Sequence, residues 1–147
     1  RHHYATNGGP SGRMRLDVGL RFDAGTGTVT AVTDGQIDTL EGCTSISDSS
    51  GNLLFYSDGT TVWDKKHDIM PGGSGLFGNS SSAQSALFVP NPENSNIYYL
   101  FVVGNNRNPG FFYYTIDLSE NGGFGSVVSG PIEYTKAGLL FKEPCFK

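Results

Sequence analysis

The fold is decided by residues 41–64, EGCTSISDSSGNLLFYSDGTTVWD. β-Branched and aromatic residues recur in this stretch, which predicts three short strands of a pleated sheet. We expect these strands at residues 43–47, 52–57 and 60–63. Asp48-Ser49-Ser50-Gly51 supplies the first reversal, and Asp58-Gly59 supplies the second. Asp-Gly between β-rich runs is typical of a tight hairpin, so the three strands are predicted to be antiparallel.

The middle strand is apolar in both directions. Leu53 and Phe55 point to one face, and Leu54 and Tyr56 point to the other. A sheet with one wetted face would alternate apolar and polar residues. This sheet is therefore expected to be covered on both sides, which favours a blade stacked between blades.

Further strands are predicted on both sides of this stretch, with a second unit that repeats the first. They are expected at residues 20–22, 28–32, 86–89, 97–103, 111–118, 127–128 and 132–134. Residues 71–75, PGGSG, are predicted to be irregular, and residues 76–82 are predicted to be a Ser-rich loop that crosses to the next sheet. In the overlay of the two units, Phe55 matches Phe101, and Trp63-Asp64 matches Ile116-Asp117. Such spacing suits propeller blades of about 40 to 50 residues.

The predicted fold class is all-β, with antiparallel blade-like sheets that form a partial β-propeller. The alternative is a β-sandwich with a similar number of strands. Residues 1–18 are predicted to be a poorly defined N-terminal segment and residues 136–147 an atypical tail. Residues 19–135 are predicted to be the propeller-like module, with two to three blades of a larger domain.

Composition excludes some partners. Only 16% of the 147 residues are charged, and the net charge is −4 at pH 7. We therefore expect no nucleic-acid binding and no insertion into a membrane, because the chain has neither a basic patch nor a run of apolar residues that could span a bilayer. A disulfide between Cys43 and Cys145 is one alternative, and a buried Cys43 without a disulfide is the preferred interpretation.

Candidates for catalysis are few. The acidic residues fall almost entirely at positions where a carboxylate caps backbone amides: Asp34, Asp38, Glu41, Asp48, Asp58 and Asp64. His67 lies in a charged run and is interpreted as a solvated turn residue. Ser57-Asp58-Gly59-Thr60 is similar to the turn of sialidase-type propellers, but the spacing up to Trp63 does not fit. A non-enzymatic module is therefore predicted, and a secreted propeller hydrolase of the glycosidase type is the alternative.

Candidate binding and modification sites follow from side-chain type. Ring stacking on a glycan, or contact with a protein, is predicted for Trp63, Tyr113 and Tyr114. Calcium is the one possible cofactor, because oxygen-bearing side chains alternate at Asp48, Ser50 and Asn52; a plain β-turn is the preferred interpretation there. Two short patterns mark glycosylation candidates, Thr39 in Asp-Thr-Leu and Asn79 in Asn-Ser-Ser.

The segment from Val32 to Val103 closely resembles the N-terminal β-propeller-like module of large surface proteins exported by the type IX secretion route. The resemblance is carried by TDGQ, EGC, ISDSSGNLLFYSDGTTVWD, HDIMPGGSGLFGNSSSAQSA and VPNPENSNIYYLF. Proteins of this family occur in gliding-type bacteria and carry PKD-like repeats and a C-terminal sorting domain. The resemblance implies a secreted or cell-surface location and a role in adhesion or display, through contacts with surface proteins or glycans.

Two or three blades in a row would leave their outermost faces uncovered. Large exposed apolar surfaces are unusual in a monomer. The expected cover is either other blades of a longer parent chain or a second copy of this chain.

Overall fold

The computed structural model describes residues 2–4, 19–23, 25–39 and 41–134. They form eleven strands in three antiparallel sheets, and the one helical element among them is the short 3-10 turn η1 (Asn121–Gly123). The predicted all-β, antiparallel class is confirmed. The predictions for residues 5–18, for the tail at 136–147 and for Cys145 lie outside the described residues.

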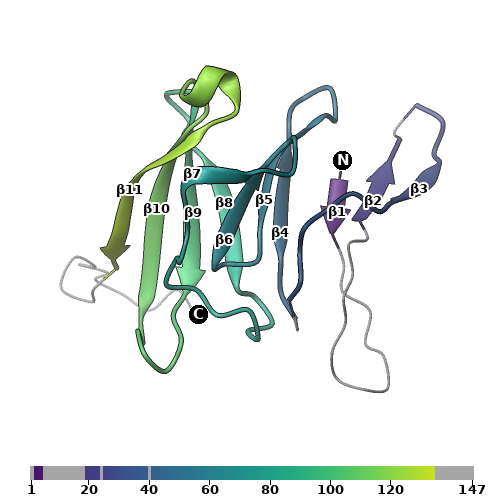
Figure 1. Ribbon diagram of the computed structural model, residues 1–147. Coiled ribbons are helices and arrows are strands. Elements are labelled where there is room, and N and C mark those ends of the chain that lie inside the picture. The colour runs from purple at the N-terminus through teal and green to yellow at the C-terminus, as the bar shows by residue number, and fades with distance from the viewer. Residues whose placement is uncertain (1, 5–18, 24, 40, 135–147) are drawn as a thin grey trace, which may run out of the picture.

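Each sheet is a simple up-and-down arrangement in which neighbours in sequence pair (Figure 1). The first sheet consists of β1 (His2–Tyr4), β2 (Gly19–Phe22) and β3 (Val29–Val32). The second consists of β4 (Thr44–Ser47), β5 (Leu53–Ser57), β6 (Thr61–Asp64) and β7 (Ile69–Ser74). The third consists of β8 (Ala86–Pro90), β9 (Ile97–Val103), β10 (Phe111–Asp117) and β11 (Ser126–Glu133). The strands predicted from residues 41–64 are all present within a residue or two of their expected ends.

The acidic residues of the hairpins close the turns, as predicted. Asp48 Oδ1 accepts the N–H groups of Ser50 and Asn52 at 2.9 and 2.8 Å. Asp58 Oδ1 accepts those of Thr60 and Thr61, and Asp64 Oδ1 accepts those of Lys66 and Asp68. Each carboxylate thus satisfies two backbone donors that the reversal of the chain leaves without a strand partner.

The second sheet is covered on both faces. On one face Phe55 is fully buried, with its ring edge-on to Phe88 at 4.9 Å and to Tyr98 at 5.0 Å, both from the third sheet. On the other face Tyr56 is fully buried in a smaller cluster with Trp63 and Ile37. The prediction that both faces of β5 are covered is confirmed.

The second and third sheets pack with their strands in the same order. β4 contacts β8 at one edge, and β7 contacts β11 at the other. The first sheet lies on the opposite side of the second, where β1 contacts β4 (Figure 1).

The prediction that residues 71–75 are irregular is wrong, because β7 runs through Pro71, Gly72 and Gly73. β7 is the outermost strand of its sheet and pairs with β6 alone, and an edge strand tolerates a proline that lacks a donor. Gly72 also has a positive φ of 71° and lies against β11, where an added Cβ would be 2.6 Å from the Val127 carbonyl oxygen. The close approach of β11 requires glycine at this position.

The two strands predicted at 127–128 and 132–134 are one strand, β11, which continues through Gly130 and Pro131. The pairing of β10 with β11 shifts register on either side of Thr115. β11 is also an edge strand, and edge strands accommodate such irregularities.

Candidate functional site

The face of the third sheet that points away from the second sheet is apolar, and the side chains at its margins are exposed. Along β9, Leu100 and Val102 point into the core against the second sheet, so Phe101 and Val103 point away from it. We call this surface the outer face; it comprises Leu87, Val89, Tyr99, Phe101, Val103, Phe111, Tyr113 and Ile132. The strand register places these residues side by side, with Phe101 opposite both Leu87 and Tyr113.

Aromatic rings form a continuous patch across the middle of the outer face. The Phe101 ring stacks on that of Phe111 at 5.5 Å and lies 5.7 Å from that of Tyr113, which meets Tyr99 edge-on at 6.1 Å. At the margins of the patch, Leu87 is 50% exposed and Phe111 is 41% exposed. A contiguous apolar surface is unusual on a monomer.

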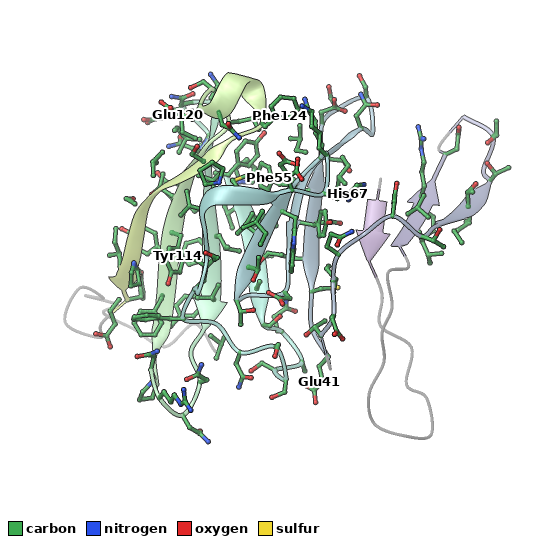
Figure 2. All side chains as sticks on the ribbon, viewed as in Figure 1. Glu41, Phe55, His67, Tyr114, Glu120 and Phe124 are labelled. Carbon is green, nitrogen blue, oxygen red and sulfur yellow. The ribbon has the colours of Figure 1, made fainter. Side chains whose placement is uncertain are left out.

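The three aromatic residues predicted to bind ligands lie in three different environments. Tyr113 is half-buried on the outer face. Trp63 is buried beneath the first sheet and stacks on Tyr56 at 5.4 Å. Tyr114 is buried between the sheets, where its hydroxyl accepts the N–H of Phe77 at 3.0 Å (Figure 2). Only Tyr113 is therefore placed to meet a partner, and Phe101 and Phe111 are the neighbours that sequence reasoning missed.

The calcium candidates form a closed turn. Besides its two backbone contacts, the Asp48 carboxylate accepts the side-chain amide of Asn52 through Oδ2 at 3.0 Å. These hydrogen bonds, the Asn52 side chain first, lower the pKa of Asp48. Within the described ranges no group of three or more His, Cys, Asp or Glu residues is arranged to hold a metal ion. The arrangement is that of the β-turn preferred above.

Both glycosylation candidates make hydrogen bonds with residues of the Ser-rich loop, and Asn79 is itself part of this loop. Thr39 is buried, and its hydroxyl donates to the Ser80 carbonyl, so modification would require this contact to open. Asn79 Oδ1 accepts the N–H and the hydroxyl of Ser81 at 3.0 and 2.9 Å. Glycosylation of either residue stays a prediction.

A second feature is a pocket of about 340 Å³ where the first sheet meets the second. We call it the junction pocket. It is lined by Arg21, Val32, Asp34, Asn52, Leu53, Lys65 and His67. Sequence reasoning missed it because its lining comes from four separate segments with no common spacing.

A chain of polar contacts runs from the buried Tyr56 to His67 and Asp34, which line the junction pocket. The Gln36 N–H donates to the Tyr56 hydroxyl at 3.1 Å, and that hydroxyl lies 3.0 Å from His67 Nδ1. His67 Nε2 lies 3.4 Å from Asp34 Oδ2. A carboxylate only accepts, so a proton on Nε2 faces the Asp34 carboxylate. The interpretation of His67 as a solvated turn residue is wrong in part: it lies in the turn, but its side chain is only 20% exposed.

The Cys43 thiol is half-buried and has a raised pKa. Burial, and secondarily the charge of Asp58, raise the pKa of this thiol to about 11. The thiolate is the reactive form, and it is scarce at neutral pH when the pKa is so high. Cys43 was expected to be buried; it is half-buried and packs against the cluster of Ile37, Tyr56 and Trp63.

Comparison of the chain with protein-family models, with curated proteins and with solved structures gave no match. Among the described residues there is no helix with the length and apolar character needed to cross a membrane.

Proposed function

We propose that this chain is a non-enzymatic module of a secreted or cell-surface protein, and that it acts through contacts of its outer face. The observation that carries the proposal is the aromatic patch around Phe101, which lies on a sheet whose opposite face is already packed. Adhesion or display is the role we propose. The resemblance to type IX-exported surface proteins supports the location.

We propose further that the three sheets are consecutive blades of a partial β-propeller. The matching strand order of the second and third sheets supports this, as do the β4–β8 and β7–β11 contacts. A sandwich of two sheets needs only one buried face on each, whereas Phe55 and Tyr56 are buried on opposite faces of β5. The burial of both residues favours three sheets stacked one after another over a sandwich of two sheets.

The repeat then defines what the outer face accepts. Phe55 of β5, the second strand of its sheet, packs toward the third sheet, and Phe101 of β9, the second strand of the third sheet, points away from the second sheet. By this equivalence, the outer face takes a further four-stranded antiparallel sheet with an apolar face. Burial of about 200 Å² of apolar surface would contribute about 5 kcal/mol to such a contact.

We propose that the sheet that covers the outer face belongs to a longer parent protein. A second copy of this chain is the alternative source. Self-association that depends on concentration and requires Phe111 would favour the second copy. Dye binding by a chain that remains monomeric would favour the parent protein.

The absence of enzymatic activity is tested by incubation of the chain with a panel of glycoside and ester substrates. Asp48, Asp58 and Asp64 all accept backbone hydrogen bonds in turns, which supports a structural role for these carboxylates. We expect no turnover above that of buffer. Turnover that a single carboxylate substitution abolishes would contradict the proposal and favour the propeller hydrolase.

A further inference from the structure

The junction pocket lies on the opposite side of the second sheet from the outer face, so an inference drawn from it does not depend on the proposed contacts. Figure 2 shows His67 on the side of the second sheet that faces the strands of the first sheet. The pocket volume of about 340 Å³ is at the small end of the range for ligand sites, about 300 to 1,000 Å³. This volume suits one sugar ring rather than a large ligand.

The polar groups of the pocket carry charges of both signs. Arg21 is exposed and lines the pocket with its positive charge, which also acts on the Asp23 carboxylate two residues along the chain. Asp34 is 65% exposed, with Oδ2 3.4 Å from His67 Nε2, and its carboxylate oxygens can accept from a hydroxyl donor. Lys65 adds a second positive charge to the lining, although its ammonium also lies 5.1 Å from the centre of the Phe124 ring.

The position of the His67 side chain is fixed by a buried neighbour and by its backbone conformation. Tyr56 is fully buried and positions His67 through the hydrogen bond to Nδ1. The His67 backbone has a positive φ of 70°, which is uncommon for a residue other than glycine, and its N–H donates to the Asp64 carbonyl at 3.0 Å. A side chain held in this way on a strained backbone position is often part of a binding site.

We propose that the junction pocket binds an acidic sugar unit, a ring that carries hydroxyls and one carboxylate. Arg21 pairs with the carboxylate in the two-pronged geometry that guanidinium favours. Asp34 and the side-chain oxygen of Asn52 accept from ring hydroxyls. Val32 and Leu53 contact the apolar C–H face of the ring. The net charge of the chain is −4, so this pocket, with two cations and one carboxylate, is a local exception to the acidic balance.

The test is a titration of the full ¹⁵N-labelled chain with D-glucuronate, followed by ¹H–¹⁵N correlation spectra, with D-glucose as the neutral probe. We expect saturable shifts of the amide signals of Arg21, Asn52, Leu53 and His67. Glucuronate should bind at least about tenfold more tightly than glucose, a difference of about 1.4 kcal/mol. Arg21→Gln should reduce the affinity for glucuronate to that for glucose and leave the glucose affinity unchanged.

Lys66→Gln is the matched control, because it removes one exposed cation that lies between two pocket residues, Lys65 and His67, but does not itself line the pocket. This variant should bind glucuronate as the parent chain does. The spectrum of each variant also reports whether it is folded. Equal affinities for the two sugars, equal losses in Arg21→Gln and Lys66→Gln, or no shift of the pocket amides up to about 50 mM glucuronate would each overturn the proposal.

Discussion

Phe55 and Tyr56 are consecutive residues of one strand, and both side chains are fully buried on opposite faces of the sheet. Phe55 packs between the second and third sheets (Figure 2). Tyr56 packs against Trp63 and Ile37 on the other side. Adjacent strand residues point in opposite directions, so a strand can bury both only if its sheet lies between two layers. This relationship is the physical basis for a series of stacked sheets.

Replacement of Phe55 by alanine should lower the free energy of unfolding by about 3 to 5 kcal/mol. The cause is a cavity left where the ring now meets Phe88 and Tyr98. Urea denaturation followed by tryptophan fluorescence measures the change. Leu87→Ala is the control, since Leu87 lies half-exposed on the outer face and should cost less than about 1 kcal/mol. Equal losses for the two variants would contradict the assignment of Phe55 to the inter-sheet core.

Gly78→Ala should destabilise the chain severely, by about 3 kcal/mol or more, because the new Cβ would overlap the backbone of Gly59. Neither segment can yield easily, since Gly59 also packs against the Ser85 backbone. The matched control is Gly25→Ala, where the Cβ meets only the Asp23 side chain at 3.4 Å. Thermal unfolding of both variants checks this. A melting temperature for Gly78→Ala equal to that of Gly25→Ala would exclude the tight crossing of these loops.

The Cys43 thiol should weaken the fold at alkaline pH. Its pKa rises from an ordinary 9.0 in the unfolded chain to about 11 in the folded chain, chiefly through burial. As the pH rises, the thiol of the unfolded state loses its proton first, and this favours unfolding. The stability that the protonated thiol adds to the fold is therefore fully present below pH 9 and is lost as the pH rises toward 11. Comparison with Cys43→Ala by urea denaturation from pH 7 to pH 11 isolates it. A difference between the two chains that does not change with pH would be inconsistent with the raised pKa.

Asp48 should contribute to acid sensitivity. Its pKa is lowered by the Asn52 side-chain hydrogen bond and by backbone N–H groups of the turn. A lowered folded pKa adds stability that is present above the ordinary value of 3.8 and is lost as the pH falls through the folded pKa. Asp48→Asn should therefore flatten the fall in stability between about pH 5 and pH 2. An unchanged acid profile in this variant would show that the turn does not hold the carboxylate ionised.

Local patterns predicted most of the strands, including the edge strands β4 and β8, but not β7 or the continuity of β11. Residues 97–103 were predicted with the bounds of β9, because apolar residues on both faces and flanking turn residues act within a short window. β7 was missed because Pro71 and the glycines after it are poor strand formers on their own. Its strand conformation depends on β6 and on the approach of Val127 from β11, which no local window contains.

The candidate sites were less predictable than the fold, because they depend on which residues meet in space. Tyr113 and Tyr114 are adjacent in sequence, yet one lies on the outer face and the other in the core. The polar contacts at the junction pocket join Asp34, Tyr56 and His67, which come from different strands and turns. Only the packing of the first sheet on the second brings them together.

The availability of the outer face is tested most directly by sedimentation velocity of the full chain with a hydrophobic fluorescent dye, detected at both protein and dye wavelengths. We predict that the wild-type chain either carries the dye at its monomer mass of 15.7 kDa or sediments as a larger species as its concentration rises. Phe111→Lys should lose both behaviours while it keeps its stability, because Phe111 is 41% exposed at the margin of the patch. A wild-type chain that stays monomeric at high micromolar concentration and binds no dye would contradict the account.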